Sequence, residues 1–306
     1  MESLQVTKTR RKAVQNVGQI TKAMEVVSAT KMRRAQEVAL NSRPYAFEAI
    51  HLLEKLSKNT PTQNILTTER PVKKTLLLIV ASDKGLTGAF NTQVFRATDR
   101  LLESENFDND NLVVVAVGKK TTNYCLKKKL NIIKSFQGVG DFAKPEEVAP
   151  LTETLINGFK NGDWDKVITV STHFRTALKQ ETLTRQILPV DFGKIRETIK
   201  EIVPEHGRYA DIVESKVKSE EVEYIFEPTA KTVVEFLIPH LVKLQIYHLV
   251  LEANASEHSA RRVAMKTASD NAKDLADSLT LEYNKARQAS ITRELIEITS
   301  TQTALN

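Results

Sequence analysis

The sequence predicts a mixed α/β protein in which a long antiparallel coiled coil of the N- and C-terminal helices carries an α/β head. Three observations lead to this prediction. Residues 240–306 contain neither glycine nor proline, the two residues that helix interiors tolerate least. Small or apolar side chains recur at helical spacing near the N-terminus, and the middle of the chain alternates apolar runs with helix-length segments.

The C-terminal segment has the pattern of a rod that is apolar along one side. Its seam steps by three and four residues through Met265, Ala268, Ala272, Leu275 and Leu279. Acid–base pairs four residues apart, such as Glu257 and Arg261, add a few tenths of a kcal/mol each on a helix surface. The helix is expected to begin at Pro228, because proline suits the first helical turn. Pro239 is a candidate kink.

The N-terminal segment supplies a matching helix. Its expected seam comprises Val14, Val17, Thr21, Met24, Ser28, Lys31, Ala35 and Val38. Gly18 is the weak point within this helix, and Pro44 marks its expected break. Most seam residues are small or apolar, so two helix backbones could approach closely along it. We therefore expect the two ends of the chain to pair as one antiparallel coiled coil.

The segment between the two helices predicts a Rossmann-like, mostly parallel α/β head domain. Apolar runs typical of strands are Leu76–Ser82, Leu112–Val117, Leu130–Phe136, Val167–His173, Thr184–Val190 and Glu221–Glu227. Helices are expected at Ala89–Glu103, in the lysine-rich stretch that ends at Lys129, and at Pro145–Lys160. Alternation of this kind places helices on the faces of a parallel sheet, with the last two strands as candidate antiparallel edges.

The chain therefore divides into four predicted segments. They are a coiled-coil helix at 1–58, a linker at 59–74, the head at 75–227 and the long C-terminal helix at 228–306. The single cysteine, Cys125, cannot form an internal disulfide, which favours a reducing compartment. Apolar runs such as Leu76–Ala81 are far shorter than a membrane span, and the first residues lack the apolar core of a signal peptide.

The positive charge of the chain is concentrated at its N-terminal end. The net charge is +6, and residues 1–58 alone hold 11 Lys/Arg against 5 Asp/Glu. A basic helix fits an acidic partner, which could be nucleic acid, an anionic membrane surface or an acidic protein cavity. A solvated helix face explains the same charges without any partner.

No catalytic or cofactor-binding motif is complete in the sequence. Gly118-Lys-Lys-Thr121 resembles the end of a P-loop, but that motif needs a glycine where Val113 stands and Ser or Thr where Lys120 stands. Gly85-Leu-Thr-Gly88 is only half of a dinucleotide-binding motif, and a tight strand-to-helix turn explains it better. The histidines have no metal-ligand spacing. We expect a non-enzyme without cofactor or metal.

Three stretches resemble one family, the gamma subunit of F-type ATP synthase. They are Ile20–Gln36 (ITKAMEVVSATKMRRAQ), Ser82–Asn91 (SDKGLTGAFN) and Tyr283–Ile298 (YNKARQASITRELIEI). They occur in the family's order and cover both ends and the middle of the chain. The two terminal motifs are long and specific.

The resemblance implies a central rotor shaft that couples proton flow to the catalytic beta subunits and is itself non-catalytic. In this family the coiled coil enters a ring of alternating alpha and beta subunits, and acidic beta loops face the shaft. The head sits on the membrane ring of c subunits and on the epsilon subunit. The resemblance thus implies a peripheral membrane protein, at the cytoplasmic face of a bacterial membrane, with no nucleic-acid partner.

The family's contacts with the alpha and beta subunits map onto both predicted helices. They are Arg287, Gln288, Thr292, Glu294 and Glu297 on the C-terminal helix, with Lys22 and Met24 on the N-terminal one. Packing in the seam explains Met24 equally well, and Arg293 with Glu297 fits an ordinary helix pair. The chain departs from the family in its polar tail, in Thr87 where a cysteine is common, and in lacking the two-cysteine insert of the chloroplast form.

Two other functions remain open on the residues alone. One is an α/β nucleotide-binding protein with coiled-coil arms. The other is a nucleic-acid-binding arm, although the absence of aromatic residues before Tyr45 disfavours recognition of single strands.

Overall fold

A computed structural model describes residues 4–41, 64–191 except 106, 109 and 142, residue 227, and residues 229–304. The chain forms two compact units. One comprises residues 1–28 with 262–306, and the other comprises residues 29–261. The predicted strand at 221–227 lies outside the described residues except for residue 227, and so do the first residues of the predicted linker, 59–63. The four-segment division of the chain therefore stays a prediction.

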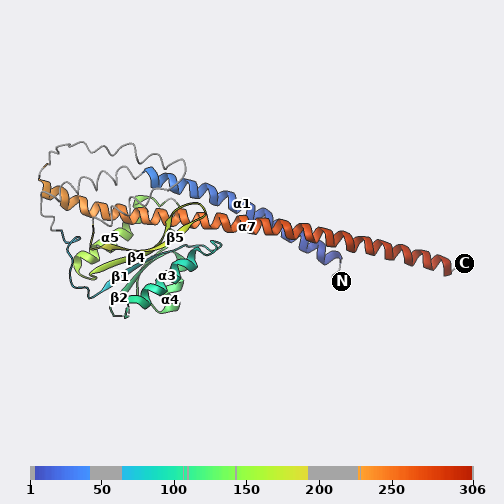
Figure 1. The fold of residues 1–306 in the computed structure, drawn as a ribbon, viewed down its shortest axis with the longest axis horizontal. Coiled ribbons are helices and arrows are strands. Elements are labelled where there is room, and N and C mark those ends of the chain that lie inside the picture. Colours follow the sequence, from blue (N-terminus) through green and yellow to red (C-terminus); the bar gives the residue numbers. More distant parts are fainter. Residues whose placement is uncertain are drawn as a thin grey trace. The chain divides into compact units, whose positions relative to one another are not determined.

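The first unit is an antiparallel pair of helices (Figure 1). Helix α1 spans Leu4–Asn41 and helix α7 spans Ala230–Ala304. Gly18 faces Ala272 closely enough that an added Cβ would lie 3.4 Å from the Ala272 Cβ. The Arg11 guanidinium lies 5.1 Å from the centroid of the Tyr283 ring. The lower-numbered residue of α1, Arg11, therefore contacts the higher-numbered residue of α7, Tyr283. The two helices run antiparallel, as predicted.

The register of this seam differs in part from the prediction. At least partly buried residues recur along α1 at Leu4, Thr7, Arg11, Val14, Gly18, Thr21, Met24, Glu25 and Ser28. Along α7 they recur at Met265, Ala268, Ser269, Ala272, Ala276, Leu279, Tyr283, Ala286 and Ser290. Val17 is 51% exposed and Leu275 is 43% exposed, so both assignments to the seam are wrong.

The physical reason is the close approach of the two helix backbones. Gly18 and Ala272 lie opposite each other, where larger side chains would hold the helices apart. Their larger neighbours along the helices therefore lie outside the seam. Gly18, which the sequence marked as a weak point of α1, is a packing position.

The head is built on a five-stranded sheet with the order β3-β2-β1-β4-β5. The strands are β1 (Thr75–Val80), β2 (Leu112–Val117), β3 (Ile132–Phe136), β4 (Lys166–Phe174) and β5 (Gln180–Leu188). The first four run parallel, and β5 pairs antiparallel with β4 at the edge. The predicted mostly parallel sheet with an antiparallel edge is confirmed.

Helices cover both faces of the sheet (Figure 1). They are α3 (Phe90–Glu105), α4 (Lys119–Lys128) and α5 (Pro145–Asn161), together with the first part of α7. Leu76 and Leu78 of β1 pack in one core with α5 and α7, whereas Leu77 and Ile79 pack in a second core with α3 and α4. This alternation explains why β1 is apolar throughout.

One stretch of α7 is long and apolar enough, by composition alone, to cross a membrane. The prediction that apolar runs are too short for a span missed this stretch, because its residues are interrupted by single polar ones. Half of the window is buried inside the protein. Ile238, Val242 and Ile246 lie fully buried in the core shared with α5 and the sheet. Packing against the sheet therefore accounts for their apolar character.

Candidate functional site

The carboxyl edge of the parallel strands is the place where folds of this class bind nucleotides. In this chain a carboxylate side chain lies at that position. Asp83, just after β1, accepts hydrogen bonds from the backbone N–H of Lys119 at the start of α4 (2.8 Å) and from that of Gly138 after β3 (2.9 Å). The first of these amides, at the N-terminus of α4, is of the kind that binds phosphate. The carboxylate of Asp83 already occupies both amides.

The turn that contains Asp83 is closed by its own hydrogen bonds. Ser82 donates from its hydroxyl to the Lys84 carbonyl (2.6 Å) and from its backbone N–H to Asn91 Oδ1 (3.1 Å). Asn91 in turn donates to the Thr87 hydroxyl (3.1 Å). The half-motif Gly85–Gly88 is therefore a structural strand-to-helix turn.

Gly118, at the next turn along the sheet edge, is required by the backbone. Its φ is +93°, and an added Cβ would lie 2.2 Å from the Ala81 carbonyl oxygen. The P-loop-like stretch that follows it opens α4 directly, and Thr121 is buried and donates to the Val117 carbonyl (2.8 Å). Its hydroxyl thus serves the fold.

The described residues offer neither a metal-binding cluster nor a reactive thiol. No group of three or more His, Cys, Asp or Glu side chains among them could hold a metal ion. Cys125 is fully buried, and burial raises the pKa of its thiol to about 12. The thiol therefore stays protonated and is a poor nucleophile.

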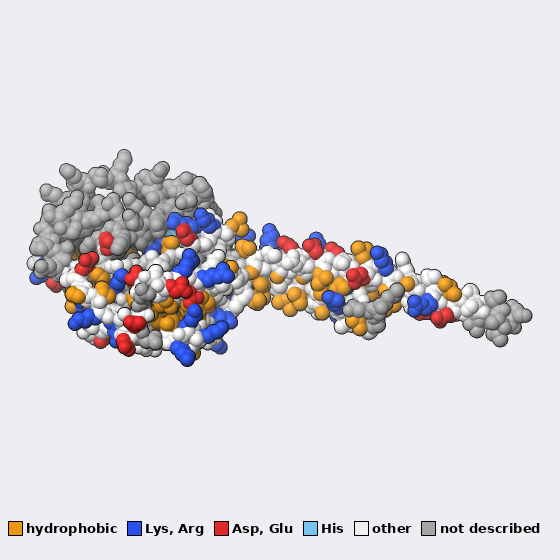
Figure 2. Space-filling view, turned by 60° about the horizontal axis from the view of Figure 1, so that its bottom comes forward, with side chains coloured by type: hydrophobic (Ala, Val, Ile, Leu, Met, Phe, Trp, Pro, Cys, Tyr) orange, Lys and Arg blue, Asp and Glu red, His pale blue; other side chains and the backbone are white. Residues whose placement is uncertain are grey.

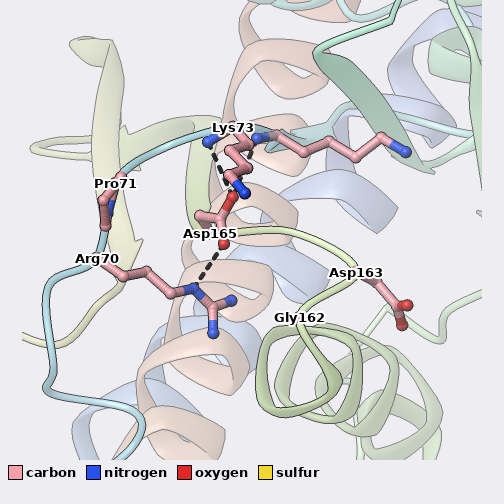
Figure 3. Close-up of a pocket in the computed structure, with 7 residues that line it drawn as sticks. Arg70, Pro71, Lys73, Gly162, Asp163 and Asp165 are labelled. Atoms are coloured by element: carbon pink, nitrogen blue, oxygen red, sulfur yellow. Dashed lines mark hydrogen bonds and ion pairs between the residues drawn. The ribbon is translucent and has the colours of Figure 1, made fainter.

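A cavity of about 600 Å³ lies at the opposite edge of the sheet, where β1 and β4 begin (Figure 3). Arg70 pairs with Asp165 (Nε to Oδ1, 2.6 Å), and Asp165 also accepts the backbone N–H groups of Lys73 (2.9 Å) and Lys74 (3.1 Å). Burial raises the pKa of Asp165, but these hydrogen bonds and the Arg70 charge outweigh it, so the pKa lies below its usual value. The pair fixes the start of two strands.

The seven predicted partner contacts lie on the coiled coil in two separate groups. Lys22 is exposed and pairs with Glu25 (2.9 Å), while Met24 is half-buried. The other five lie exposed on α7: Arg287, Gln288, Thr292, Glu294 and Glu297. Arg287 lies about 15 residues beyond Ala272, a rise of about 22 Å along α7. The structure therefore does not bring the two groups into one site.

Apolar side chains that the sequence reading missed are exposed on the same coiled coil. Ile291, Leu295 and Ile298 are 47%, 57% and 63% exposed. Their spacing of four and three residues places them on one stripe of α7, while Glu294 and Glu297 continue the line of the seam. Val17, Ile20 and Val27 form a second exposed stripe on α1. Apolar spacing outside the expected seam was the signal that could have revealed both stripes.

Exposed apolar groups of this kind usually mark binding surfaces. Figure 2 shows hydrophobic side chains interspersed with charged ones on the surface of the coiled coil. The fold and these surfaces define a class of protein: two long paired helices joined to an α/β head, with apolar and charged side chains exposed on the helices.

The chain belongs to the ATP synthase gamma chain family. The family model described as ATP synthase matches residues 3–305. The ATP synthase gamma chain of Roseiflexus castenholzii is 36% identical over 308 residues, covering all of this chain and 99% of the relative. The gamma chain of Cupriavidus pinatubonensis is 37% identical over 294 residues, covering 96% of each.

Solved structures share the fold at lower sequence identity. A chain of the Euglena gracilis mitochondrial ATP synthase has a TM-score of 0.61 and 18% identity, with 99% of this chain and 94% of that chain covered. A chain in the central stalk and c-ring structure of the Tetrahymena thermophila enzyme has a TM-score of 0.57 and 22% identity, with 82% and 99% covered. The predicted resemblance and fold are thus confirmed.

Proposed function

We propose that this chain is the central rotor shaft of a proton-translocating ATP synthase. It couples proton flow through the membrane ring to conformational change at the catalytic beta subunits and performs no catalysis itself. The observation that carries the proposal is the two-helix coiled coil with exposed apolar stripes, in a chain whose relatives are named ATP synthase gamma chains over their full length.

The mechanism follows from symmetry. A single two-helix shaft inside a ring of three catalytic sites cannot contact the three sites alike. Each site is biased toward an open or closed state by the contacts that the shaft makes in that state, since a partner shifts an equilibrium only by its differential affinity. Turning the shaft moves those contacts from one site to the next.

The seven residues Lys22, Met24, Arg287, Gln288, Thr292, Glu294 and Glu297 are the proposed contacts with the alpha and beta subunits. Arg287 and Gln288 support this assignment best, since both are exposed on α7 and no apolar packing explains their place. The stripe of Ile291, Leu295 and Ile298 adds an apolar surface beside them. The basic N-terminal arm fits the acidic beta loops that the family presents to its shaft.

The head is the proposed seat on the membrane ring and the epsilon subunit. The solved structures that share this fold are those of a central stalk with a c-ring and of a rotor, and we extend that association to this chain. The protein would then be a peripheral component of a membrane complex, with its head toward the cytoplasmic face of a bacterial membrane. No nucleic acid takes part.

The nucleotide-binding alternative is disfavoured by Asp83, which occupies the amides that a phosphate would need. Titration of the isolated chain with ATP or NAD tests it, and we expect no specific binding. Specific micromolar binding of either nucleotide would contradict the rotor proposal.

The direct test is charge reversal at Arg287. The chain is assembled with its alpha, beta and epsilon subunits and the membrane ring in vesicles, and proton pumping is measured against ATP hydrolysis. We expect Arg287→Glu to lower the number of protons pumped per ATP, because the contact made by that charge is reversed. Lys285→Glu, at another exposed position of α7, is the matched control. An unchanged pumping ratio in Arg287→Glu would remove Arg287 from the contacts.

A further inference from the structure

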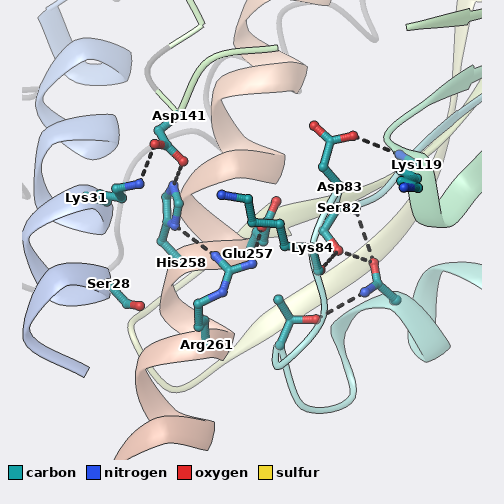
Figure 4. A network of polar contacts seen from close by, with 12 residues as sticks. Ser28, Lys31, Ser82, Asp83, Lys84, Lys119, Asp141, Glu257, His258 and Arg261 are labelled. Carbon is teal, nitrogen blue, oxygen red and sulfur yellow. Dashed lines mark hydrogen bonds and ion pairs between the residues drawn. The ribbon is translucent and has the colours of Figure 1, made fainter. Parts of the chain in front are cut away.

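Five charged or titratable side chains meet in the head unit at the place where α1, the β3–α5 loop and α7 come together (Figure 4). They are Lys31 of α1, Asp141 of the loop, and Glu257, His258 and Arg261 of α7. We call this group the root clasp. Lys31 Nζ lies 2.5 Å from Asp141 Oδ2, and His258 Nε2 lies 3.1 Å from Asp141 Oδ1. One carboxylate therefore binds both helices.

The hydrogen bonds of the root clasp fix the state of His258. Its Nδ1 lies 3.2 Å from the Arg261 guanidinium, which can only donate, so Nδ1 accepts and Nε2 carries the proton. The Nε2–H group then donates to Asp141. Arg261 also pairs with Glu257, one turn earlier on α7. His258 and Arg261 are both buried, whereas the side chains of Lys31 and Asp141 are 36% and 40% exposed, so the cluster runs from the interior to the surface.

The same segment of α7 is tied to two loops at the carboxyl edge of the sheet. Asn254 donates its side-chain amide to the Gly140 carbonyl (3.0 Å), one residue before Asp141. Ser259 donates to the Ala177 carbonyl in the β4–β5 turn (2.6 Å). Residues 254–261 are therefore a segment of α7 that the head holds by polar contacts, next to Glu252, which pairs with His173 of β4 (2.9 Å).

The root clasp stands close to both places where the chain passes between the two units. These passages fall at residues 28/29 in α1 and 261/262 in α7. Lys31 lies three residues inside the first passage, and Arg261 is the last residue before the second. Any torque that passes between coiled coil and head runs through these two helices. A joint that binds both helices to the β3–α5 loop of the head resists the turning of one helix without the other.

We propose that Asp141, held by Lys31 and His258, is a positioning residue for torque transmission that locks both helices of the shaft to the head. The proposal rests on the rotor function above and adds a joint to it. A rotor with a slack joint still hydrolyses ATP, but part of each turn is lost before it reaches the membrane ring. Coupling, rather than hydrolysis, is the quantity that the clasp controls.

The test compares Asp141→Ala and Lys31→Met, singly and together, with Lys31→Arg as the conservative variant. Asp163→Ala removes an exposed carboxylate from the pocket edge of the same unit and is the control. In the assembled complex in vesicles, we expect the first two variants to lower protons pumped per ATP at least twofold with hydrolysis retained. The double variant should be no worse than either single one, and Lys31→Arg should restore most of the coupling.

Hydrogen exchange on the isolated full-length chain supplies the local readout. Amides of residues 254–261 should exchange at least tenfold faster in Asp141→Ala, while those of β1 and β2 stay unchanged. Faster exchange throughout the head with normal coupling would mean that Asp141 serves stability alone, and would overturn the proposal. Normal exchange and normal coupling would overturn it too. If the chain without substitutions fails to support pumping, the rotor function itself fails, and the clasp loses its role with it.

Discussion

The two halves of α7 belong to one unbroken helix but are buried in different ways. Between residues 231 and 251 its inward side consists mainly of large aliphatic side chains, such as Ile238 and Ile246, packed in the core with α5 and the sheet, and between 252 and 261 the buried side chains are small or polar, such as Ala255 and His258. Between residues 262 and 304 the buried positions are mostly smaller, as at Ala272 and Ala276, while Leu275 lies exposed. The first half is an anchor, and the second half keeps apolar surface available to partners.

The largest difference between the halves should appear in stability. Ile238→Ala removes a fully buried side chain and leaves a cavity, which should lower the free energy of unfolding by about 2–5 kcal/mol. Leu281→Ala removes an exposed side chain of the other half and should change it by less than about 0.5 kcal/mol. Denaturant unfolding of the isolated chain measures both. Equal losses of unfolding free energy in the two variants would mean that the two halves of α7 contribute to stability in the same way.

A second difference should appear with pH, because the anchor half contains His258. Burial lowers the pKa of His258 to about 4, with the nearby Arg261 and Lys31 charges adding to the effect and Asp141 opposing it. The unfolded chain takes up a proton below about pH 6.5, whereas the folded chain does so only near pH 4. Stability should therefore fall as pH drops through this window, by on the order of 2–3 kcal/mol in total.

His258→Gln isolates this effect, since glutamine can donate to Asp141 and accept from Arg261 without titrating. Burial raises the pKa of Glu257, so that group stabilises the fold as pH falls and works against the histidine in the same window. Both proteins keep Glu257, and the difference between their stability profiles from pH 7.5 to 4.5 belongs to His258. Parallel profiles would show that the imidazole titrates alike in the folded and unfolded chain.

The anchor half of α7 and the sheet follow closely from the sequence, because long apolar runs specify buried strands and a buried helix face. Val14, Thr21 and Ser28 of the coiled-coil seam also followed from spacing. Met24 did too, since it is partly buried, whereas Val17 did not. Hydrophobicity favours Val17 over Gly18, whereas two backbones in close contact need the glycine.

The root clasp lay beyond sequence reasoning for a different cause. Lys31 and Asp141 are 110 residues apart and belong to no local pattern. Only the packing of α1, the β3–α5 loop and α7 brings them together. The proposed contacts at Arg287 and Lys22 came from family motifs, and physical spacing alone would not have selected them. Spacing would have selected the apolar stripe at Ile291 instead.

The smallest effect on the isolated chain should come from the exposed end of α7. Replacing Ile291, Leu295 and Ile298 together by serine removes the apolar stripe without opening a cavity, because all ten residues from 291 to 300 are exposed. The free energy of unfolding should change by less than about 0.5 kcal/mol. Affinity for the ring of alpha and beta subunits should nevertheless fall roughly tenfold or more, since each side chain buried by a partner contributes about 1.5–3 kcal/mol.

Titration of the fluorescently labelled chain against the assembled alpha–beta ring measures this affinity, with Ala289→Ser as the control at an exposed position of the same helix. A loss of stability equal to the loss of affinity would show that the stripe packs within the chain. Unchanged affinity would show that the ring does not cover the apolar stripe. The exposure of apolar side chains on the second half of α7 would then not be explained by binding to the ring. If affinity falls while stability is unchanged, the second half of α7 is a binding surface and the first half alone is an anchor.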